Sequence, residues 1–408
     1  MKLRKVLFWF YVTINTVAYL LYSNGYVNSV HIVGEFYSTQ YDYFFHLIFL
    51  LLSLVLILKL SDFIYFRIKI KKFLSVNFFS CKHVLLGWFI LLVEIVYLYN
   101  LVFNSSYRAG GVDDLQGGFF GVFVALFQIQ FLPLLYFCSV SHRTVLTYFV
   151  IFLCFLINVI QGWSGIFFIL FIIYNSIIDI EKKRFGYFKF TFISLFLIFT
   201  FYPLVYLVRG IARGRYDILS SYDGYFDFAL HSYTLLIERF EQYHLSLGTY
   251  IHKVGIADAI HSGVVVPYYY EGVLSSILAK FYDMGSYKLG DYLPSVFYNI
   301  DLGSYTWNVS PGFVSLFYIN DFSSWIYIFL YYFMLMFLSL SCIKLMRCNA
   351  VMYNFYYFSL ILYLFAGWFS MFSWFCWAIL VLFLFNCIFG LIESSFRTLK
   401  LNVIHRVA

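Results

Sequence analysis

Long apolar segments alternate with short polar stretches along almost the whole chain. Ten of these segments are long enough to cross about 30 Å of hydrocarbon as helices. They are predicted near residues 6–23, 43–60, 84–103, 117–139, 145–161, 164–180, 190–208, 324–341, 351–369 and 374–391. The pattern predicts an all-α polytopic membrane protein with about ten transmembrane helices.

The composition supports a membrane protein and argues against a nucleic-acid partner. Of the 408 residues, 63% are hydrophobic and 12% are charged, whereas soluble domains carry about 25% charged residues. A water-soluble fold of this composition would lack a polar surface. The net charge of +7 comes from short basic clusters between apolar segments, which is typical of cytoplasmic loops. No signal-peptide cleavage site follows MKLRKVLFWF, so a retained first span is expected.

The distribution of lysine and arginine predicts the orientation. Nineteen of them lie on one side of the predicted spans, and the short loops on the other side contain only Arg108. The first side is therefore expected to be cytoplasmic, with both termini inside. The cytoplasmic stretch 66–79, FRIKIKKFLSVNFF, is expected to contact membrane lipids, either through anionic headgroups or as simple positive-inside anchoring.

The predicted spans divide the chain into three parts. Residues 1–208 contain seven spans, residues 209–323 form one large external loop, and residues 324–408 contain three spans and a cytoplasmic tail. Loops of this length are usually functional or disordered. None of the seven cysteines lies in the loop, so no disulfide framework is expected there. Within the spans, Glu94 is the one clear ionisable residue at mid-depth, expected to be either functional or hydrogen-bonded to a neighbouring helix.

Three arginines at the start of the loop are candidate anion ligands. Arg209, Arg213 and Arg215 lie in VRGIARGR. Arg209 and Arg213 share one face if the seventh span continues for another turn. Guanidinium groups bind phosphate oxygens in a bidentate manner, so an anionic headgroup with phosphate oxygens is the predicted ligand. The alternative is that these arginines only anchor the end of a helix at the membrane surface.

The segment YFDFALHSYTLLIERFEQYHL, residues 225–245, is predicted to be a single helix on the membrane surface. Its apolar side would contain Phe228, Leu235, Leu236 and Phe240. His231, Glu238 and Glu241 would share another side, where His231 or Glu238 could remove a proton from an attacking hydroxyl. A solvated helix with Glu–Arg pairs is the alternative. The spacing of the four loop histidines matches no compact metal motif, so no metal is expected.

Three motifs resemble those of the Wzy-type O-antigen polymerases, which polymerise oligosaccharide repeat units in bacteria. VRGIARGR is similar to the basic start of the large periplasmic loop in that family. LLIERFEQYH is similar to its arginine-bearing helix, which adds Arg239 to the candidate substrate ligands. LGSYTWNVSPGFVSLFYINDFSSW resembles the end of the loop and contains Pro311, Gly312 and Tyr318. The family commonly has Asn-Phe-Gly in that ending, whereas this chain has INDFSS.

The resemblance implies a GT-C-like integral-membrane glycosyltransferase of the bacterial inner membrane that needs no cofactor. Its substrate would be an undecaprenyl-diphosphate-linked oligosaccharide, with Arg209, Arg213, Arg215 and Arg239 as diphosphate ligands. The resemblance also allows a chain-length regulator as a partner. Three alternatives remain: an O-antigen ligase, a flippase for the same lipid-linked sugar, and an accessory membrane protein without catalysis.

Overall fold

The described part of the chain is helical. The structure, a computed structural model, describes residues 2–26, 40–68, 84–103, 126–140, 143–180, 184–212, 219–220, 222–273, 287–299, 301–302 and 309–407. Within these ranges no strand forms, and the β-type pairing is an isolated bridge between Val265 and Tyr287. Most of the basic stretch 66–79, from residue 69 onwards, lies outside the described residues, as does the first half of the predicted span 117–139.

Five helices in the described ranges are long and apolar enough to cross a membrane. They are α1 (Lys2–Ser23), α3 (Gln40–Arg67), α4 (Val84–Phe103), α16 (Phe322–Leu345) and α18 (Phe369–Val407). Each coincides with a predicted span, which supports the prediction of a helical membrane protein.

The other predicted spans correspond to helices of different lengths. Shorter apolar helices are α7 (Val145–Ile160), α8 (Gly165–Ile180) and α17 (Ala350–Ser359), which continues as the π-helix η5 (Leu360–Phe365). The predicted span 190–208 lies within α9 (Arg184–Ala212), and α6 (Leu132–Ser139) is the described helix of the predicted span 117–139. The ten predicted spans therefore include both long helices and short ones.

The outer faces of the long helices are apolar. Trp9 of α1, Phe63 of α3, Trp88 of α4 and Ile326 of α16 are all more than half exposed. In water, such large exposed apolar areas would promote association. In a bilayer these side chains contact lipid tails, while the helices satisfy their own backbone hydrogen bonds. The exposed surface thus supports the same assignment as the hydropathy pattern.

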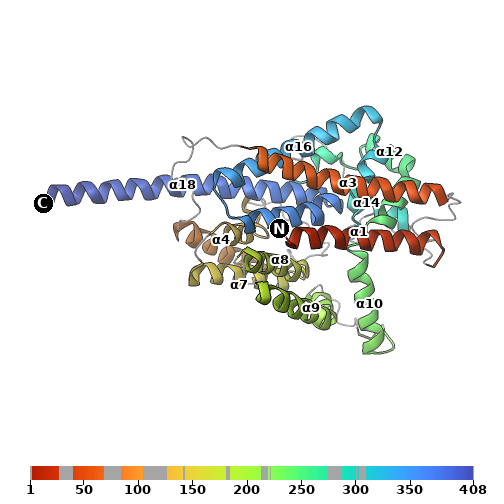
Figure 1. Cartoon of the computed structure of the whole chain (residues 1–408), viewed down its shortest axis with the longest axis horizontal. Helices are drawn as coiled ribbons and strands as arrows, with labels where there is room; N and C mark the ends of the chain where they lie inside the picture. Colours follow the sequence, from red (N-terminus) through yellow and green to blue (C-terminus); the bar gives the residue numbers. More distant parts are fainter. Residues whose placement is uncertain are drawn as a thin grey trace.

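The long helices form a bundle, and the helices of the predicted loop gather at one end of it (Figure 1). α16 packs against α18 and α3, and α1 packs against α3. Arg4 near the start of α1 donates to the Asp62 carboxylate near the end of α3 at 2.9 Å, so these two helices are antiparallel. The C-terminal part of α18 extends beyond the opposite end of the bundle (Figure 1).

The predicted loop 209–323 contains six short helical elements within its described parts. They are α10 (Tyr225–Glu238), α11 (Tyr243–Ile251), α12 (Lys253–His261), η4 (Tyr268–Tyr270), α14 (Leu289–Tyr298) and α15 (Ser315–Ile319). α11 packs against α1, α3 and α15, whereas α10 packs against α9 and projects from the bundle (Figure 1). Residues 243–251 are therefore fixed against membrane helices.

The end of the loop is held by the turn that separates the π-helix from α18. The N–H groups of Gly312 and Phe313 donate to the carbonyls of Ala366 and Phe365 at 3.0 and 2.8 Å. Gly312 and Gly367 both have positive φ angles, +82° and +88°. A Cβ on Gly367 would overlap the Gly312 backbone nitrogen, so this close approach requires glycine. The Pro-Gly motif thus has a structural role in the contact.

Candidate functional site

Arg209 lies in the last turn of α9, at an apolar cavity of about 280 Å³. The cavity is formed by α7, α8 and α9 and the turn between α7 and α8. Its other lining residues are Phe155, Val159, Gly162, Trp163, Ser164, Phe167, Phe201, Leu204, Val205 and Val208. Arg213 and Arg215 lie outside the described residues. An apolar cavity with one guanidinium group suits a ligand that has an apolar chain and an anionic head.

Arg239 lies close to this cavity, although 30 positions separate it from Arg209 in the sequence. It lines a second cavity, of about 50 Å³, together with Tyr202 and Trp163. Trp163 and Ser164 line both cavities, so the two cavities are neighbours. Both guanidinium groups interact electrostatically with Tyr202 of α9. Two of the four predicted substrate ligands are therefore brought together around one tyrosine.

The predicted single helix 225–245 is wrong, because it is broken at residues 239–242 into α10 and α11. Phe228 and Leu236 are buried as predicted. Glu241, however, lies beyond the end of α10 and is buried, whereas His231 is exposed on α10. His231 and Glu241 therefore do not share one helical side.

The two predicted bases occupy different parts of α10. The ring of His231 lies 6.3 Å from that of Tyr206 in α9, one turn before Arg209. Arg239 follows His231 by eight positions, which is about 12 Å along the axis of α10. Glu238 is the last residue of α10 and immediately precedes Arg239; its side chain lies outside the description. His231 is thus placed towards the Arg209 end of the site.

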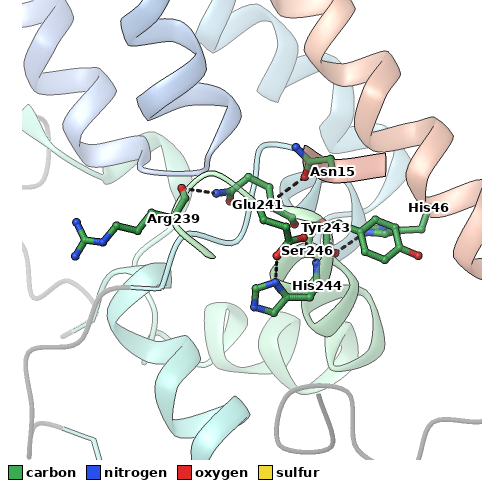
Figure 2. Close-up of polar contacts among 8 residues, drawn as sticks. Asn15, His46, Arg239, Glu241, Tyr243, His244 and Ser246 are labelled. Atoms are coloured by element: carbon green, nitrogen blue, oxygen red, sulfur yellow. Dashed lines mark hydrogen bonds and ion pairs between the residues drawn. The ribbon is translucent and has the colours of Figure 1, made fainter. Parts of the chain in front are cut away.

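The break between α10 and α11 is built around a buried polar cluster (Figure 2). The backbone N–H of Gln242 donates to Asn15 Oδ1 of α1 at 2.9 Å, and the Gln242 side chain donates to the carbonyl of Arg239 at 3.3 Å. Glu241 accepts the backbone N–H of His244 at 2.8 Å and also bonds its imidazole. Only the backbone of Arg239 joins the cluster, since its guanidinium points away (Figure 2).

The Glu241–His244 pair is a possible proton acceptor that the prediction left without an assigned role. Both side chains are buried, and Tyr22 of α1 stacks on the imidazole with ring centroids 5.5 Å apart. A carboxylate bonded to one imidazole nitrogen fixes the orientation of the ring, as in hydrolase triads. Within the described ranges, no three His, Cys, Asp or Glu side chains come together in a way that could hold a metal ion.

His46 of α3 is a buried polar residue next to the cluster that the sequence did not single out. Its Nδ1 lies 2.7 Å from the Tyr318 hydroxyl, and its Nε2 lies 2.9 Å from Ser246 Oγ and 3.1 Å from the Tyr243 carbonyl. The Tyr243 carbonyl can only accept a hydrogen bond, which places the ring proton on Nε2, so the Tyr318 hydroxyl donates to Nδ1. His46 therefore connects α3, α11 and α15.

Arg239 can bind an anion on one side of the buried polar cluster. Glu241, two residues later, is held in a fixed acid–base pair with His244. Arg239 supplies the positive charge, and Glu241 with His244 supplies the pair. This combination suits a reaction in which an anionic leaving group departs and a hydroxyl loses a proton. Searches of protein-family models, curated proteins and solved structures found no match to this chain.

Proposed function

We propose that this chain is an integral-membrane glycosyltransferase that polymerises undecaprenyl-diphosphate-linked oligosaccharide repeat units. It would act at the periplasmic face of the bacterial inner membrane and make O-antigen or capsular polysaccharide. In this proposal the chain crosses the membrane ten times, has both termini in the cytoplasm and adopts a GT-C-like fold. The proposal unites the membrane architecture, the large loop and the three motifs that resemble the Wzy-type polymerases.

The observation that carries the proposal is the convergence of Arg209 and Arg239 around Tyr202, beside an apolar cavity. A polyisoprenyl diphosphate needs both features, because its chain is apolar and its head is strongly anionic. Two guanidinium groups can neutralise the diphosphate without a metal ion. Arg213 and Arg215 follow Arg209 closely in the sequence and would add further positive charge.

The proposed reaction exchanges one C–O bond for another. A hydroxyl oxygen of the acceptor repeat unit attacks the anomeric carbon of the donor saccharide. The bond between that carbon and the diphosphate breaks, and its electron pair leaves with the diphosphate. The hydroxyl proton passes to a base of the protein. The arginines stabilise the negative charge that grows on the leaving group.

Three groups are candidates for the general base. His231 and Glu238 are the residues predicted from the sequence, and the Glu241–His244 pair is the third group. The pair lies two to five residues after Arg239, while His231 lies two helical turns before it. Replacing each group separately and comparing the dependence of turnover on pH would assign the base, since removing the base abolishes the acidic limb of the profile.

Deletion of the gene tests the polymerase function directly. A polymerase mutant accumulates lipid A–core carrying a single repeat unit, visible as one band on a polysaccharide gel. Loss of all antigen would instead favour the ligase or the flippase. These two are separated by the location of the lipid-linked product, which is periplasmic without a ligase and cytoplasmic without a flippase.

Arginine substitutions test the diphosphate contact. Arg239→Ala is expected to lower the rate of polymerisation by about 100- to 1,000-fold, the usual effect of losing a group that stabilises transition-state charge. Arg239→Lys keeps the charge but not the bidentate geometry, so an intermediate rate is expected. Arg67→Ala is the control, because Arg67 is exposed and lies about 30 Å along α3 from His46. A normal polysaccharide ladder with Arg239→Ala at normal protein level would refute the contact.

A further inference from the structure

Glu94 lies in the middle of α4, on the buried side of this helix. Its side chain is fully buried, and neither carboxylate oxygen has a hydrogen-bond partner. The hydrogen bond to a neighbouring helix that the sequence allowed is therefore not formed among the described residues. An ionised carboxylate is seldom left in this state, because burial removes its hydration and nothing replaces it.

The helices around Glu94 supply no counter-charge. α4 packs against α7, α18 and α6. Apart from Glu94, none of α4, α6, α7 and residues 369–392 of α18 contains an Asp, Glu, Lys, Arg or His. The titratable residues of these packed segments are tyrosines and cysteines. Cys154 of α7 is the one whose electrostatic interaction with Glu94 the structure shows. The negative charge of Glu94 is thus unbalanced by this part of the protein.

A second unsatisfied acceptor lies beside Cys154. Asn158 is one helical turn further along α7, on the same face as Cys154. Its amide nitrogen donates to the Cys154 carbonyl at 2.8 Å and contacts Cys154 Sγ at 3.5 Å. With the nitrogen so engaged, Asn158 Oδ1 is buried and has no hydrogen-bond partner. Glu94 and Asn158 therefore contribute three buried oxygen acceptors, and no described donor pairs with any of them.

We propose that Glu94 and Asn158 form a binding site for one small cation, H⁺ or Na⁺, inside the transmembrane bundle. A proton on Glu94 would make the carboxyl a donor to Asn158 Oδ1. Na⁺ would instead be coordinated by the carboxylate and the amide oxygen, which are hard ligands. In both cases the cation neutralises a charge that lipid and protein leave unbalanced. The site uses neither Arg209 nor Arg239 and does not depend on the proposed glycosyl transfer.

Infrared difference spectroscopy of the full-length protein in detergent tests the site. The spectrum of Glu94→Gln is subtracted from that of the wild type at about pH 7, with and without Na⁺. A carbonyl band of a protonated carboxylic acid that is insensitive to Na⁺ identifies a bound proton. Carboxylate bands that shift with Na⁺, with a Tm that rises with Na⁺ in the wild type only, identify a sodium site. Carboxylate bands and a Tm that are both insensitive to Na⁺ would overturn the proposal.

Two variants keep the test decisive. Glu94→Gln is expected to retain the Tm of the proton-bound wild type, because the amide has the same shape and can donate to Asn158. Asn158→Leu leaves Glu94 in place and provides a measurement if Glu94→Gln does not fold. It is expected to move the carboxylic-acid band to higher frequency through loss of the acceptor, or to weaken the Na⁺ effect on Tm. No change in either signal with Asn158→Leu would refute the pairing.

Discussion

Replacing Glu271 with glutamine is expected to make the protein more stable at neutral pH and to leave its stability unchanged in acid. Glu271 follows the 3₁₀ turn Tyr268–Tyr270 and is buried, with Oε1 accepting the backbone N–H of Leu289 at 3.2 Å. Burial raises the pKa of Glu271 from 4.5 to about 7, against the opposing effects of Lys288 and of the Leu289 and Ser370 N–H groups. The folded protein therefore prefers the uncharged carboxyl.

The magnitude follows from the difference between the two pKa values. A difference of about 2.5 units corresponds to roughly 3 kcal/mol, at 1.36 kcal/mol per unit. Between about pH 4.5 and pH 7 the folded state binds more protons than the unfolded state, so the free energy of unfolding falls as the pH rises. Above about pH 7 the loss is complete. Glutamine keeps the oxygen that accepts from Leu289 and does not ionise, so it escapes this loss.

Thermal unfolding in detergent, followed by circular dichroism across this pH range, measures the effect. The Tm of the wild type should fall between acidic and neutral pH relative to that of Glu271→Gln. Asp258→Asn, at an exposed carboxyl of α12, controls for the removal of one negative charge. A Tm difference between wild type and Glu271→Gln that stays constant across the range would refute the reasoning, because it would mean that folding does not change the proton affinity of Glu271.

Three further predictions concern the site and its support. If the buried pair is the base, His244→Ala should abolish turnover while His231→Ala retains most of it; the reverse result would assign His231. Gly367→Ala should lower the free energy of unfolding by at least about 1–3 kcal/mol, because a side chain is strained at its φ of +88°. Gly255→Ala is the control, since a Cβ there meets no atom within 4 Å; equal Tm values for the two variants would contradict the close contact. Leu204→Trp should obstruct the cavity beside Arg209 and raise KM for the lipid-linked substrate without changing Tm; an unchanged KM would exclude this cavity as the lipid site.

The membrane helices could be predicted from the sequence because long apolar segments determine them directly. The predicted span 84–103 coincides with α4, and the predicted spans 6–23 and 324–341 lie within α1 and α16. The membrane interior leaves the backbone few alternatives, so hydropathy is a strong local signal. The predicted span 351–369 likewise overlaps α17 and its π-helical continuation, but hydropathy could not predict their short length or the change to a π-helix at Leu360. They are buried on nearly all sides by protein, and a buried helix need not have the length of a span.

The break between α10 and α11 could not be predicted, because its causes are distant in sequence. The apolar pattern continues through Phe240 and Leu245, which favours an uninterrupted helix. The chain nevertheless turns where Asn15 of α1 binds the Gln242 N–H. His46 was missed for a different reason, since it lies inside an apolar span and no motif surrounds it. The rule that drew attention to Glu94, that ionisable residues in spans are functional candidates, would have identified His46 as well.

The contact between the end of the loop and the turn before α18 has a consequence for the biogenesis of the protein. The carbonyls of Phe365 and Ala366 become available where the π-helix ends, and unpaired carbonyls are costly inside a bilayer. Their partners, the N–H groups of Phe313 and Gly312, are synthesised about 50 residues earlier. The last two helices can therefore complete these hydrogen bonds only after residues 312 and 313 lie beside the turn before α18. Folding of the C-terminal helices is thus coupled to the earlier placement of residues 311–313 at this turn.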